Sequence, residues 1–412
     1  MSFELVELEK VIDINPESIS NISYLYEDIE YIDISSVSTG YLVEKPKELH
    51  LKEAPSRAKR IIKDKDTILA TVRPNLRAFM YIKDPKPNTI VSTGFAVLRA
   101  KVNNDPRFIY YAISDKDFTG YLSNNAKGTS YPAVDRDIIL RGKIPSFPYD
   151  KQQRIASILS AYDDLIENNR RRIQLLEESA RLLYREWFVH FRFPGHEHVE
   201  IVDGLPQGWK EVKFEDTSLK FIDGDRGKNY PNHSEFRHNG YCLFLSAKNV
   251  TSDNKFNFSN ELMFITKEKD SILRSGKLKR GDLVLTTRGT VGNIAYYDDS
   301  INFENIRINS GMVILRDFED DFESYYLYVT LRSLSFKDQM KNFTSGTAQP
   351  QLPIRDLKKM KILKPSSKIM KNYCVVLKSS SLQIQNLELQ NQKLKEARDI
   401  LLPRLMSGEI AV

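Results

Sequence analysis

Apolar residues follow two different spacings, and the two spacings alternate along the chain. Short apolar runs broken by Gly, Pro and Asn fill residues 1–150 and again 208–365, a pattern typical of strands. After each stretch, apolar residues recur at steps of three and four, which predicts a long helix. We therefore expect an α+β fold with two similar domains, each followed by its own helix.

The two strand-rich stretches repeat the same segments in the same order, at a shift of about 217 residues. The matched pairs are Asp66–Thr71 with Asp282–Thr287, Ser92–Arg99 with Asn309–Arg316, and Lys127–Pro132 with Ser345–Pro350. Residues 13–65 share little with residues 216–280. The sequence therefore predicts a duplicated scaffold whose surface loops differ between the two copies.

The two predicted helices each carry an apolar seam with heptad spacing. The first helix has no Gly or Pro from Gln152 to His190, a length of roughly 39 residues and about 58 Å. Average domain helices span only about 11 or 12 residues, so we expect the two helices to pair as an antiparallel coiled coil and act as a spacer. The seams are Tyr162, Ile166, Asn169, Ile173, Leu176, Ala180, Leu183 and Trp187, and, more weakly, Ile384, Leu387, Asn391, Leu394, Arg398 and Leu401.

Two features of the seams shape this interpretation. Asn169 and Asn391 make the seams polar in different places, and a buried Asn commonly fixes the register of paired helices. The alternative is that each helix packs on its own domain alone. With pairing, the domains are expected in a pseudo-two-fold arrangement. The expected divisions are 1–150 (first domain), 151–192 (central helix), 193–207 (linker), 208–365 (second domain) and 366–412 (distal helix and tail).

Composition narrows the class of protein. The net charge of +6, with 41% hydrophobic and 28% charged residues, is ordinary for a globular protein and permits nucleic acid as a partner without requiring it. Cys242 and Cys374 are far apart in sequence, so neither a disulfide framework nor a CxxC site is indicated. The start lacks the pattern of a signal peptide, and no apolar run approaches a membrane span. We expect a cytoplasmic protein with no membrane partner.

Several segments carry a resemblance to a known family. Gln152–Leu159 (QQRIASIL), Asp163–Ile173 (DDLIENNRRRI) and Trp187-Phe188 resemble the central conserved region of type I restriction-modification specificity subunits. Pro206–Trp209 (PQGW) resembles the opening of their second target-recognition domain, and Leu401–Ile410 (LLPRLMSGEI) their distal conserved tail. The segments stand in the family's order, and the resemblance covers the whole chain.

The resemblance implies a division of labour. Each target-recognition domain would read one half of a split double-stranded DNA sequence, while the paired helices set the gap and dock two modification subunits. S-adenosylmethionine would serve adenine methylation on those subunits, and ATP and magnesium would serve separate restriction subunits, with no cofactor in this chain. The second helix begins Pro365-Ser366-Ser367 and lacks the Gln-Gln-Arg-Ile match of the first, so the two docking surfaces need not be equivalent.

Motifs for catalysis are absent or weak in the sequence. No Asn-Pro-Pro-Tyr-like methyltransferase motif is present, and the Gly required five residues before Gly276 in a phosphate loop is Ser271. Asp203 with Glu211 and Lys213 imitates nuclease spacing, but such spacing arises easily in a charged linker and strand. His190, His196 and His198 could ligate a metal, yet surface histidines in a turn are the favoured interpretation. We predict no catalytic site and no metal site.

Base edges are read by Arg, Asn or Gln on loops, while Lys, Ser, Thr and backbone N–H groups anchor phosphates. The loops around Arg73 and Arg226 are favoured as base readers, because specificity should reside where the halves differ. The repeated Gly-Thr loops are expected to contact phosphates or to preserve the scaffold, and any single Arg could be a solvated surface charge. The candidates are Arg73, Asn75, Arg77, Lys127, Thr129, Ser130, Tyr131, Arg226, Lys228, Asn229, Tyr230, Arg288, Thr290, Ser345, Thr347 and Gln349.

Three hypotheses of function follow from the sequence. The leading one is a DNA-binding specificity subunit without catalytic activity. The second is a self-sufficient methyltransferase or nuclease, which the missing cofactor motifs disfavour. The third is a coiled-coil adapter that binds protein alone. The sequence does not identify the recognised bases.

Overall fold

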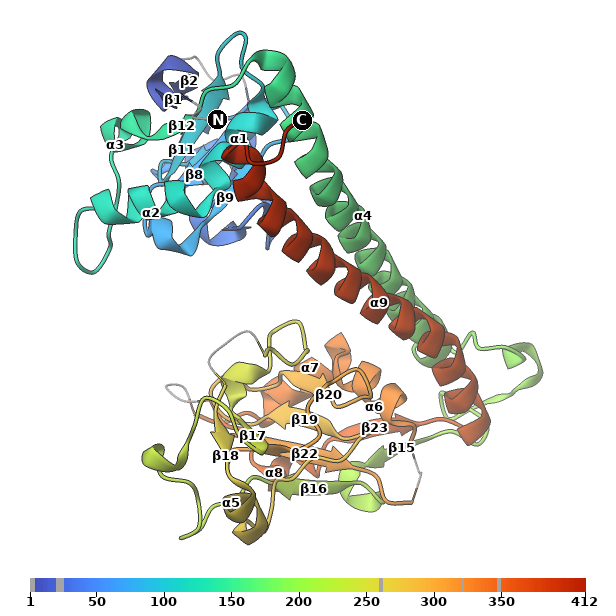
Figure 1. The fold of residues 1–412 in the computed structure, drawn as a ribbon. Helices are drawn as coiled ribbons and strands as arrows, with labels where there is room; N and C mark the ends of the chain where they lie inside the picture. Colours follow the sequence, from blue (N-terminus) through green and yellow to red (C-terminus); the bar gives the residue numbers. More distant parts are fainter. Residues whose placement is uncertain (1–3, 20–25, 259–261, 320–321, 347–349) are drawn as a thin grey trace. The chain divides into compact units, whose positions relative to one another are not determined.

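The structure is a computed structural model, and it describes residues 4–19, 26–258, 262–319, 322–346 and 350–412 (Figure 1). The chain divides into two compact units, residues 1–170 with 388–412 and residues 171–387. Two helices of 40 residues, α4 (Tyr149–Phe188) and α9 (Ser367–Met406), each contribute one part to each unit. The first unit is therefore discontinuous in sequence, whereas the second is one continuous segment.

The first unit holds the first domain, whose described strands form two four-stranded sheets (Figure 1). One sheet has the order β2-β11-β8-β9 and is antiparallel. The other has the order β6-β3-β10-β7 and contains one parallel pair, β3 with β10. The strands are β2 (Ile12–Ile14), β3 (Asp28–Ile32), β6 (Lys47–His50), β7 (Ala58–Ile61), β8 (Thr67–Ala70), β9 (Phe79–Tyr81), β10 (Thr89–Ser92) and β11 (Phe95–Ala100).

The second unit holds a domain whose described strands repeat this arrangement, with one strand fewer in the mixed sheet. Its antiparallel sheet has the order β16-β22-β19-β20, and its other sheet has the order β18-β17-β21, in which β17 and β21 are parallel. The strands are β16 (Lys220–Asp223), β17 (Cys242–Leu245), β18 (Phe264–Ile265), β19 (Leu283–Thr286), β20 (Ile294–Tyr296), β21 (Ile306–Ile308) and β22 (Met312–Arg316). The sequence repeats lie on matching strands, which confirms the duplicated α+β scaffold.

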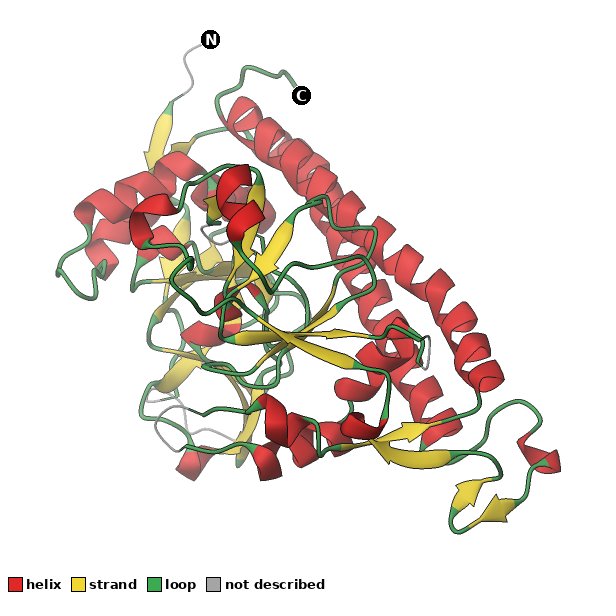
Figure 2. Ribbon diagram, turned by 90° about the horizontal axis from the view of Figure 1, so that it is seen from below, coloured by secondary structure: helices red, strands yellow, loops and turns green. Residues whose placement is uncertain are grey.

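Figure 2 draws the helices red and the strands yellow. Several of the remaining elements recur in both domains. In each, the opening strand pairs antiparallel with the strand that precedes the long helix, and three shorter helices lie between the sheets and that strand in sequence. The elements are β1 (Leu5–Glu7), β4 (Val37–Ser38), β5 (Tyr41–Leu42), α1 (Pro106–Ser114), α2 (Lys116–Asn125), α3 (Arg136–Arg141) and β12 (Lys143–Pro145), then β13 (Ile201–Val202), β14 (Leu205–Pro206), β15 (Lys210–Lys213), α5 (Lys267–Ile272), α6 (Ser324–Leu331), α7 (Leu334–Phe343), α8 (Ile354–Leu357) and β23 (Lys361–Lys364).

A buried ion pair connects neighbouring strands in each domain. Arg99 donates from Nε and Nη2 to the two carboxylate oxygens of Asp66, both at 2.8 Å. Arg316 donates to Asp282 in the same way, at 2.7 and 2.6 Å. Asp66 and Asp282 are 0% and 1% exposed, so each carboxylate depends on its arginine for a charged partner. Asp66 and Asp282 begin one pair of repeated segments, and Arg99 and Arg316 end the other pair, so the ion pair accounts for the repetition of these four residues.

The long helices α4 and α9 pair antiparallel, as the sequence predicts. In the first unit, Asn169 Nδ2 donates to Asn391 Oδ1 at 3.0 Å, and Asp163, one and a half turns earlier in α4, pairs with Arg398, later in α9. In the second unit, Tyr373 packs on Trp187 with ring centroids 5.7 Å apart. The two seam asparagines, interpreted from the sequence as polar interruptions in different places, therefore form one buried pair.

The end of α9 belongs to the core of the first domain. Leu402, Leu405 and Met406 are buried in the same cluster as Ile155 and Leu159 of α4. Along both helices the seam residues are buried or half-buried. Several leucines outside the seam are exposed. Among the helices that the structure describes, none combines the length and apolar character needed to span a membrane.

We predict that the Asn169–Asn391 pair stabilises the helix register only when both residues are present. Asn391→Leu alone should lower the free energy of unfolding by about 1–3 kcal/mol, because it leaves a buried amide without its partner. The double variant Asn169→Leu with Asn391→Leu should recover most of that loss, since both partners are then apolar. Chemical unfolding of the single and double variants measures the coupling. Additive losses would contradict a direct interaction between the two amides.

Candidate nucleic-acid interface

The predicted loops of the first domain are held together by backbone hydrogen bonds. We define the first loop cluster as residues 71–77, which follow β8, with residues 127–134, which follow α2. Thr71 N donates to Gly94 O at 2.8 Å, and Val134 N donates to Thr71 O at 2.9 Å. Lys127 and Ala133 exchange two hydrogen bonds of 2.8 and 2.9 Å. The Gly-Thr loop is therefore a closed hairpin fixed beside the loop after β8.

The second domain builds the same arrangement from the repeated residues. We define the second loop cluster as residues 225–230, 287–293, 309–311 and 345–351, of which 347–349 lie outside the described residues. Thr287 N donates to Gly311 O at 2.8 Å, and Leu352 N donates to Thr287 O at 3.0 Å. Ser345 and Gln351 exchange two hydrogen bonds of 2.9 Å. In both domains a loop after a central strand, residues 71–77 after β8 or 287–293 after β19, thus lies beside the described residues that flank the Gly-Thr segment.

The exposed tip of the first loop cluster combines a cation with an aromatic ring. The Arg73 guanidinium lies 4.6 Å from the centroid of the Tyr131 ring and donates from Nη2 to Ser130 O at 3.3 Å. Tyr131 is 69% exposed, so this stack presents its outer surface to solvent. Asn75, Lys127, Thr129 and Ser130 are also exposed, and Lys127 pairs with Asp135 at 3.2 Å. The structure brings all these candidates into one cluster.

Arg77 lies in the same loop but points into the domain. Its Nη2 donates to Ser114 O, at the end of α1, at 2.6 Å, and Thr39 Oγ1 donates to Arg77 O at 2.9 Å. Arg77 is half-buried, and both Arg73 and Arg77 adopt the left-handed backbone region with φ of 51° and 55°. Arg77 therefore fixes the loop to α1, and its contacts favour a positioning role over one in reading bases.

The candidates in residues 226–230 differ in how strongly they are held. Arg226 pairs with Asp223 at 2.8 Å and donates to Ser310 O at 3.2 Å. Asn229 donates to Ile272 O at 3.4 Å. Tyr230 packs on the Phe244 ring, and burial raises the pKa of its hydroxyl above the ordinary value. Lys228 is exposed. Arg226 and Lys228 therefore face solvent, whereas Tyr230 anchors the loop.

The other candidates of the second loop cluster are exposed, and two lie outside the described residues. Arg288, Thr290 and Ser345 are exposed, and Arg288 N donates to Gly311 O at 3.1 Å. Thr347 and Gln349 belong to the part of the chain that the structure does not describe. Sequence reasoning did not single out Arg274, whose backbone N–H donates to Asp225 Oδ2 at 2.6 Å. It lies in the region that is unlike the first domain, where no repeat could identify it.

Residues of the weak enzymatic motifs make structural contacts with neighbouring residues. Glu211 pairs with Lys361 at 2.8 Å, and Lys213 pairs with Glu215 at 3.3 Å, so the E-x-K spacing lies within paired strands and their ends. His196 Nδ1 lies 2.9 Å from Phe193 O. Within the described ranges, no three His, Cys, Asp or Glu side chains gather as a metal site would require. Burial raises the pKa of Cys242 and Cys374 to about 12, which keeps both thiols protonated.

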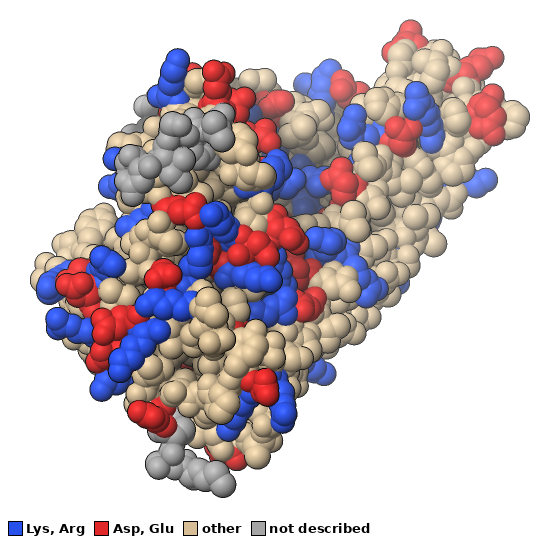
Figure 3. Space-filling view, turned by 90° about the horizontal axis from the view of Figure 1, so that it is seen from above, with Lys and Arg blue, Asp and Glu red and all other residues tan. Residues whose placement is uncertain are grey.

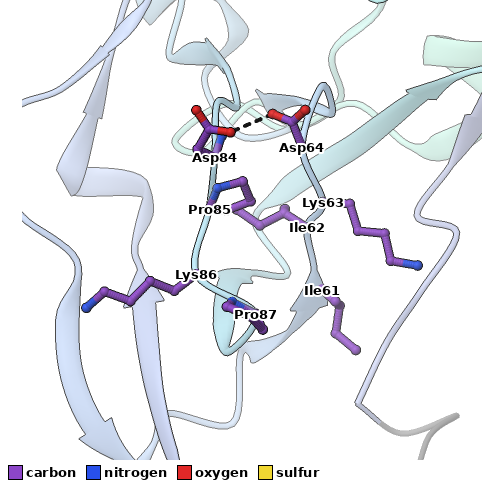
Figure 4. Close-up of a pocket in the computed structure, with 8 residues that line it drawn as sticks. All are labelled: Ile61, Ile62, Lys63, Asp64, Asp84, Pro85, Lys86 and Pro87. Carbon is purple, nitrogen blue, oxygen red and sulfur yellow. Dashed lines mark hydrogen bonds between the residues drawn. The ribbon is translucent and has the colours of Figure 1, made fainter.

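A hollow beside β7 offers no comparable chemistry. It is lined by residues 61–64 and 84–87 and has a volume of about 460 Å³ (Figure 4). Asp84 N donates to Asp64 at its rim at 3.0 Å. Its two lysines already pair with carboxylates outside it, Lys63 with Glu17 and Lys86 with Glu30, both at 2.5 Å. The loop clusters therefore remain the candidate functional surfaces.

The charge on the surface is mixed and not uniformly basic. Figure 3 shows Lys and Arg side chains interleaved with Asp and Glu over one face of the molecule. Uniform electrostatic attraction to phosphates would need a basic stripe. The described residues on the face drawn in Figure 3 form no such stripe.

Comparison with known proteins identifies the class. The protein family described as "Type I restriction modification DNA specificity domain" matches residues 2–178 and again residues 206–396. The chain belongs to this family and carries two copies of its domain. Specificity subunits of type I enzymes are DNA-recognition subunits without catalytic activity, and this chain is therefore a recognition subunit of such a system.

Individual relatives agree over nearly the full length. The chain is 27% identical to the type I restriction enzyme MjaIX specificity subunit of Methanocaldococcus jannaschii, over 97% of this chain and 86% of that protein. It is 24% identical to the HindI specificity subunit of Haemophilus influenzae, over 95% and 97%. The crystal structure of a type I S subunit from M. genitalium shares the fold, with a TM-score of 0.59, 15% identity, and 98% and 96% of the two chains covered.

We predict that Arg73 and Arg77 respond differently to truncation. Arg73→Ala should weaken DNA binding by about 1–3 kcal/mol, because an exposed Arg on a reading loop loses contacts to DNA. Arg77→Ala should mainly lower the unfolding midpoint, because it leaves Ser114 O without its donor. DNA affinity of the chain in complex with its partner subunits, measured beside thermal unfolding, separates the two effects. Wild-type DNA affinity in Arg73→Ala would remove Arg73 from the interface.

Proposed function

We propose that this chain reads a split double-stranded DNA target, with each of its two domains recognising one half. The observation that carries the proposal is the pair of loop clusters, which use the same backbone hydrogen bonds but different side chains. The shared bonds connect Thr71 to Gly94 and Thr287 to Gly311. A shared backbone framework with different exposed side chains is the arrangement expected of two domains that recognise different half-targets.

The paired helices α4 and α9 set the gap between the half-targets and dock two modification subunits. Outside their seam, both helices expose large apolar side chains, among them Leu165 and Leu175 in α4 and Val375 and Leu389 in α9. Exposed apolar side chains in such numbers support a protein partner on the helices. The exposed sets differ between α4 and α9, which supports docking surfaces that are not equivalent.

The chemistry belongs to the partner subunits in this proposal. The modification subunits transfer a methyl group from S-adenosylmethionine to adenine, and restriction subunits in the full complex use ATP and magnesium. The complex acts in the cytoplasm, where its DNA is. This chain contributes recognition and spacing, and its own residues take no part in the chemical steps.

The proposal predicts that methyl transfer needs both partners. The purified chain alone should neither methylate nor cleave DNA, whereas the chain with its modification subunit should methylate a two-part motif. Labelled methyl transfer, a gel-shift assay and sequencing of methylated genomic DNA measure activity, binding and motif. Methyl incorporation by the chain alone would indicate an enzyme, and partner binding without any DNA binding would indicate a protein adapter.

We predict that lengthening the helices changes the gap and leaves the half-targets unchanged. A seven-residue insertion directly after Asn169 in α4, matched by one directly before Asn391 in α9, keeps the seam in register. It adds about 10.5 Å of helix, which corresponds to about three base pairs at about 3.4 Å each. Sequencing of the methylated motif measures the gap.

A four-residue insertion at the same places is the control, because it does not complete a heptad and should disturb the seam. An unchanged gap in a folded, active seven-residue variant would mean that the helices do not determine the spacing.

A further inference from the structure

The second domain contains a buried charged cluster beside its scaffold ion pair, and Arg316 Nη2 links the two by donating to Lys277 O at 3.0 Å. Arg307 of β21 and Asp270 of α5 are each 5% exposed, and Arg307 Nε donates to Asp270 Oδ1 at 2.5 Å. Lys277 Nζ donates to the other oxygen, Oδ2, at 2.5 Å. Burial favours the neutral acid, but the hydrogen bonds from Lys277 and Arg307 outweigh it and hold the pKa of Asp270 below its ordinary value. The carboxylate is therefore charged and fully engaged.

The remaining donors of Arg307 hold the turn that follows α5. Nη1 donates to Ser275 O at 2.6 Å, and Nη2 donates to Asp270 O at 2.8 Å and to Leu273 O at 3.1 Å. One carbonyl oxygen of α5 and two of the turn that follows it are thus fixed by a single planar guanidinium. Lysine cannot reproduce this pattern, because its ammonium is a compact group without a rigid fork of donors.

The turn that Arg307 fixes supports, by its own hydrogen bonds, the loop that carries Arg226 and Lys228. Arg274 N donates to Asp225 Oδ2 at 2.6 Å, and Ser275 Oγ donates to Asp223 O at 2.5 Å. Ile272 O accepts a hydrogen bond from Asn229. Residues 223–229 therefore rest on residues 272–275, and Arg226 and Lys228 project from the supported segment.

The described residues of the first domain contain no such cluster, although the domain shares the scaffold. At the repeat shift that aligns Gly94 with Gly311, the residue matching Arg307 is Ile90, which is fully buried among apolar neighbours. The ion pairs Asp66–Arg99 and Asp282–Arg316, by contrast, are present in both domains. Within the described ranges this buried charge occurs in one of the two domains, so the shared scaffold does not require it. It occurs where the two halves differ, beside a loop proposed to read DNA.

We propose that Arg307 is a positioning residue for DNA specificity, which acts through the turn at residues 272–275 to hold the loop at residues 225–230 against the second half of the target. The inference rests on the proposed function of the chain. Arg307 itself is buried and touches no DNA. Its effect is to restrict the loop to one conformation. The hydrogen-bond donors of the loop then cannot rearrange to suit a wrong base pair, which is therefore rejected.

The test uses the full chain in complex with its modification subunit. Methylation rates are measured on the matched target and on targets with one base pair changed in the first or in the second half. Arg307→Lys keeps a positive charge beside Asp270 but loses the donors to the turn. Asp225→Ala removes one loop anchor without touching the buried cluster. Both variants should lose about tenfold of their discrimination in the second half and none in the first.

Tyr326→Phe is the matched control in the same domain, because it removes a hydrogen bond to Leu363 O far along the chain from the loop. It should lower stability without changing discrimination. Unchanged discrimination in folded Arg307→Lys would overturn the inference. If Arg307→Lys does not fold, unchanged discrimination in Asp225→Ala overturns it equally, as does an equal loss in Tyr326→Phe. Wild-type complex that methylates no split target would instead overturn the proposed function, and this inference with it.

Discussion

The antiparallel pairing of α4 with α9 is the constraint on which the rest of the structure depends. An apolar seam alone would tolerate sliding by one heptad, because each apolar layer resembles the next. The buried Asn169–Asn391 pair removes that freedom, since a shifted register would place each amide against apolar side chains. The Asp163–Arg398 ion pair adds a second, charged restriction in the first unit, and Tyr111 donates to the same carboxylate at 2.6 Å. The helix register is therefore tied directly to α1 of the first domain.

In each domain, the contacts that hold the central strands are separate from the side chains of the exposed loops. The central strands are joined by a buried Asp–Arg pair and by backbone bonds around a glycine, Gly94 or Gly311. Neither feature uses the side chains of the exposed loops. Loops can consequently differ between the two copies without weakening the sheet, and a domain of this construction can acquire a different surface at little cost in stability.

The parts of the structure that repeat in the sequence could be predicted from it. The two domains, the long helices and the seam all follow from periodicity, because burial imposes a spacing that a single sequence displays. The loops around Arg73 and Arg226 are favoured for another reason, that specificity should reside where the two halves differ. Their internal contacts could not be predicted: nothing in the pattern distinguishes Arg73, which faces solvent, from Arg77, which donates to Ser114 O. Both arginines have the same left-handed backbone, and the difference lies in the tertiary contacts of their side chains.

The role of Arg307 could not be predicted from the sequence pattern either. It lies in a strand of three buried residues, Ile306–Ile308, where a charged side chain conflicts with the apolar pattern. Its partner Asp270 belongs to α5, and at the matching place in the first domain, after β6, stands the three-residue 3-10 helix Leu51–Glu53. A pair that is brought together only by the tertiary fold, and only once in the chain, leaves no periodic signal.

The discontinuity of the first unit has a consequence for biosynthesis. Residues 1–170 leave the ribosome before the second unit, but their core is completed by Leu402, Leu405 and Met406, which are translated after it. The second unit is continuous and can fold before the first is complete. Until those three residues are translated, the nascent first domain must keep an apolar face of Ile155 and Leu159 uncovered, and truncation directly before Leu402 removes part of the core of the first unit and none of the second.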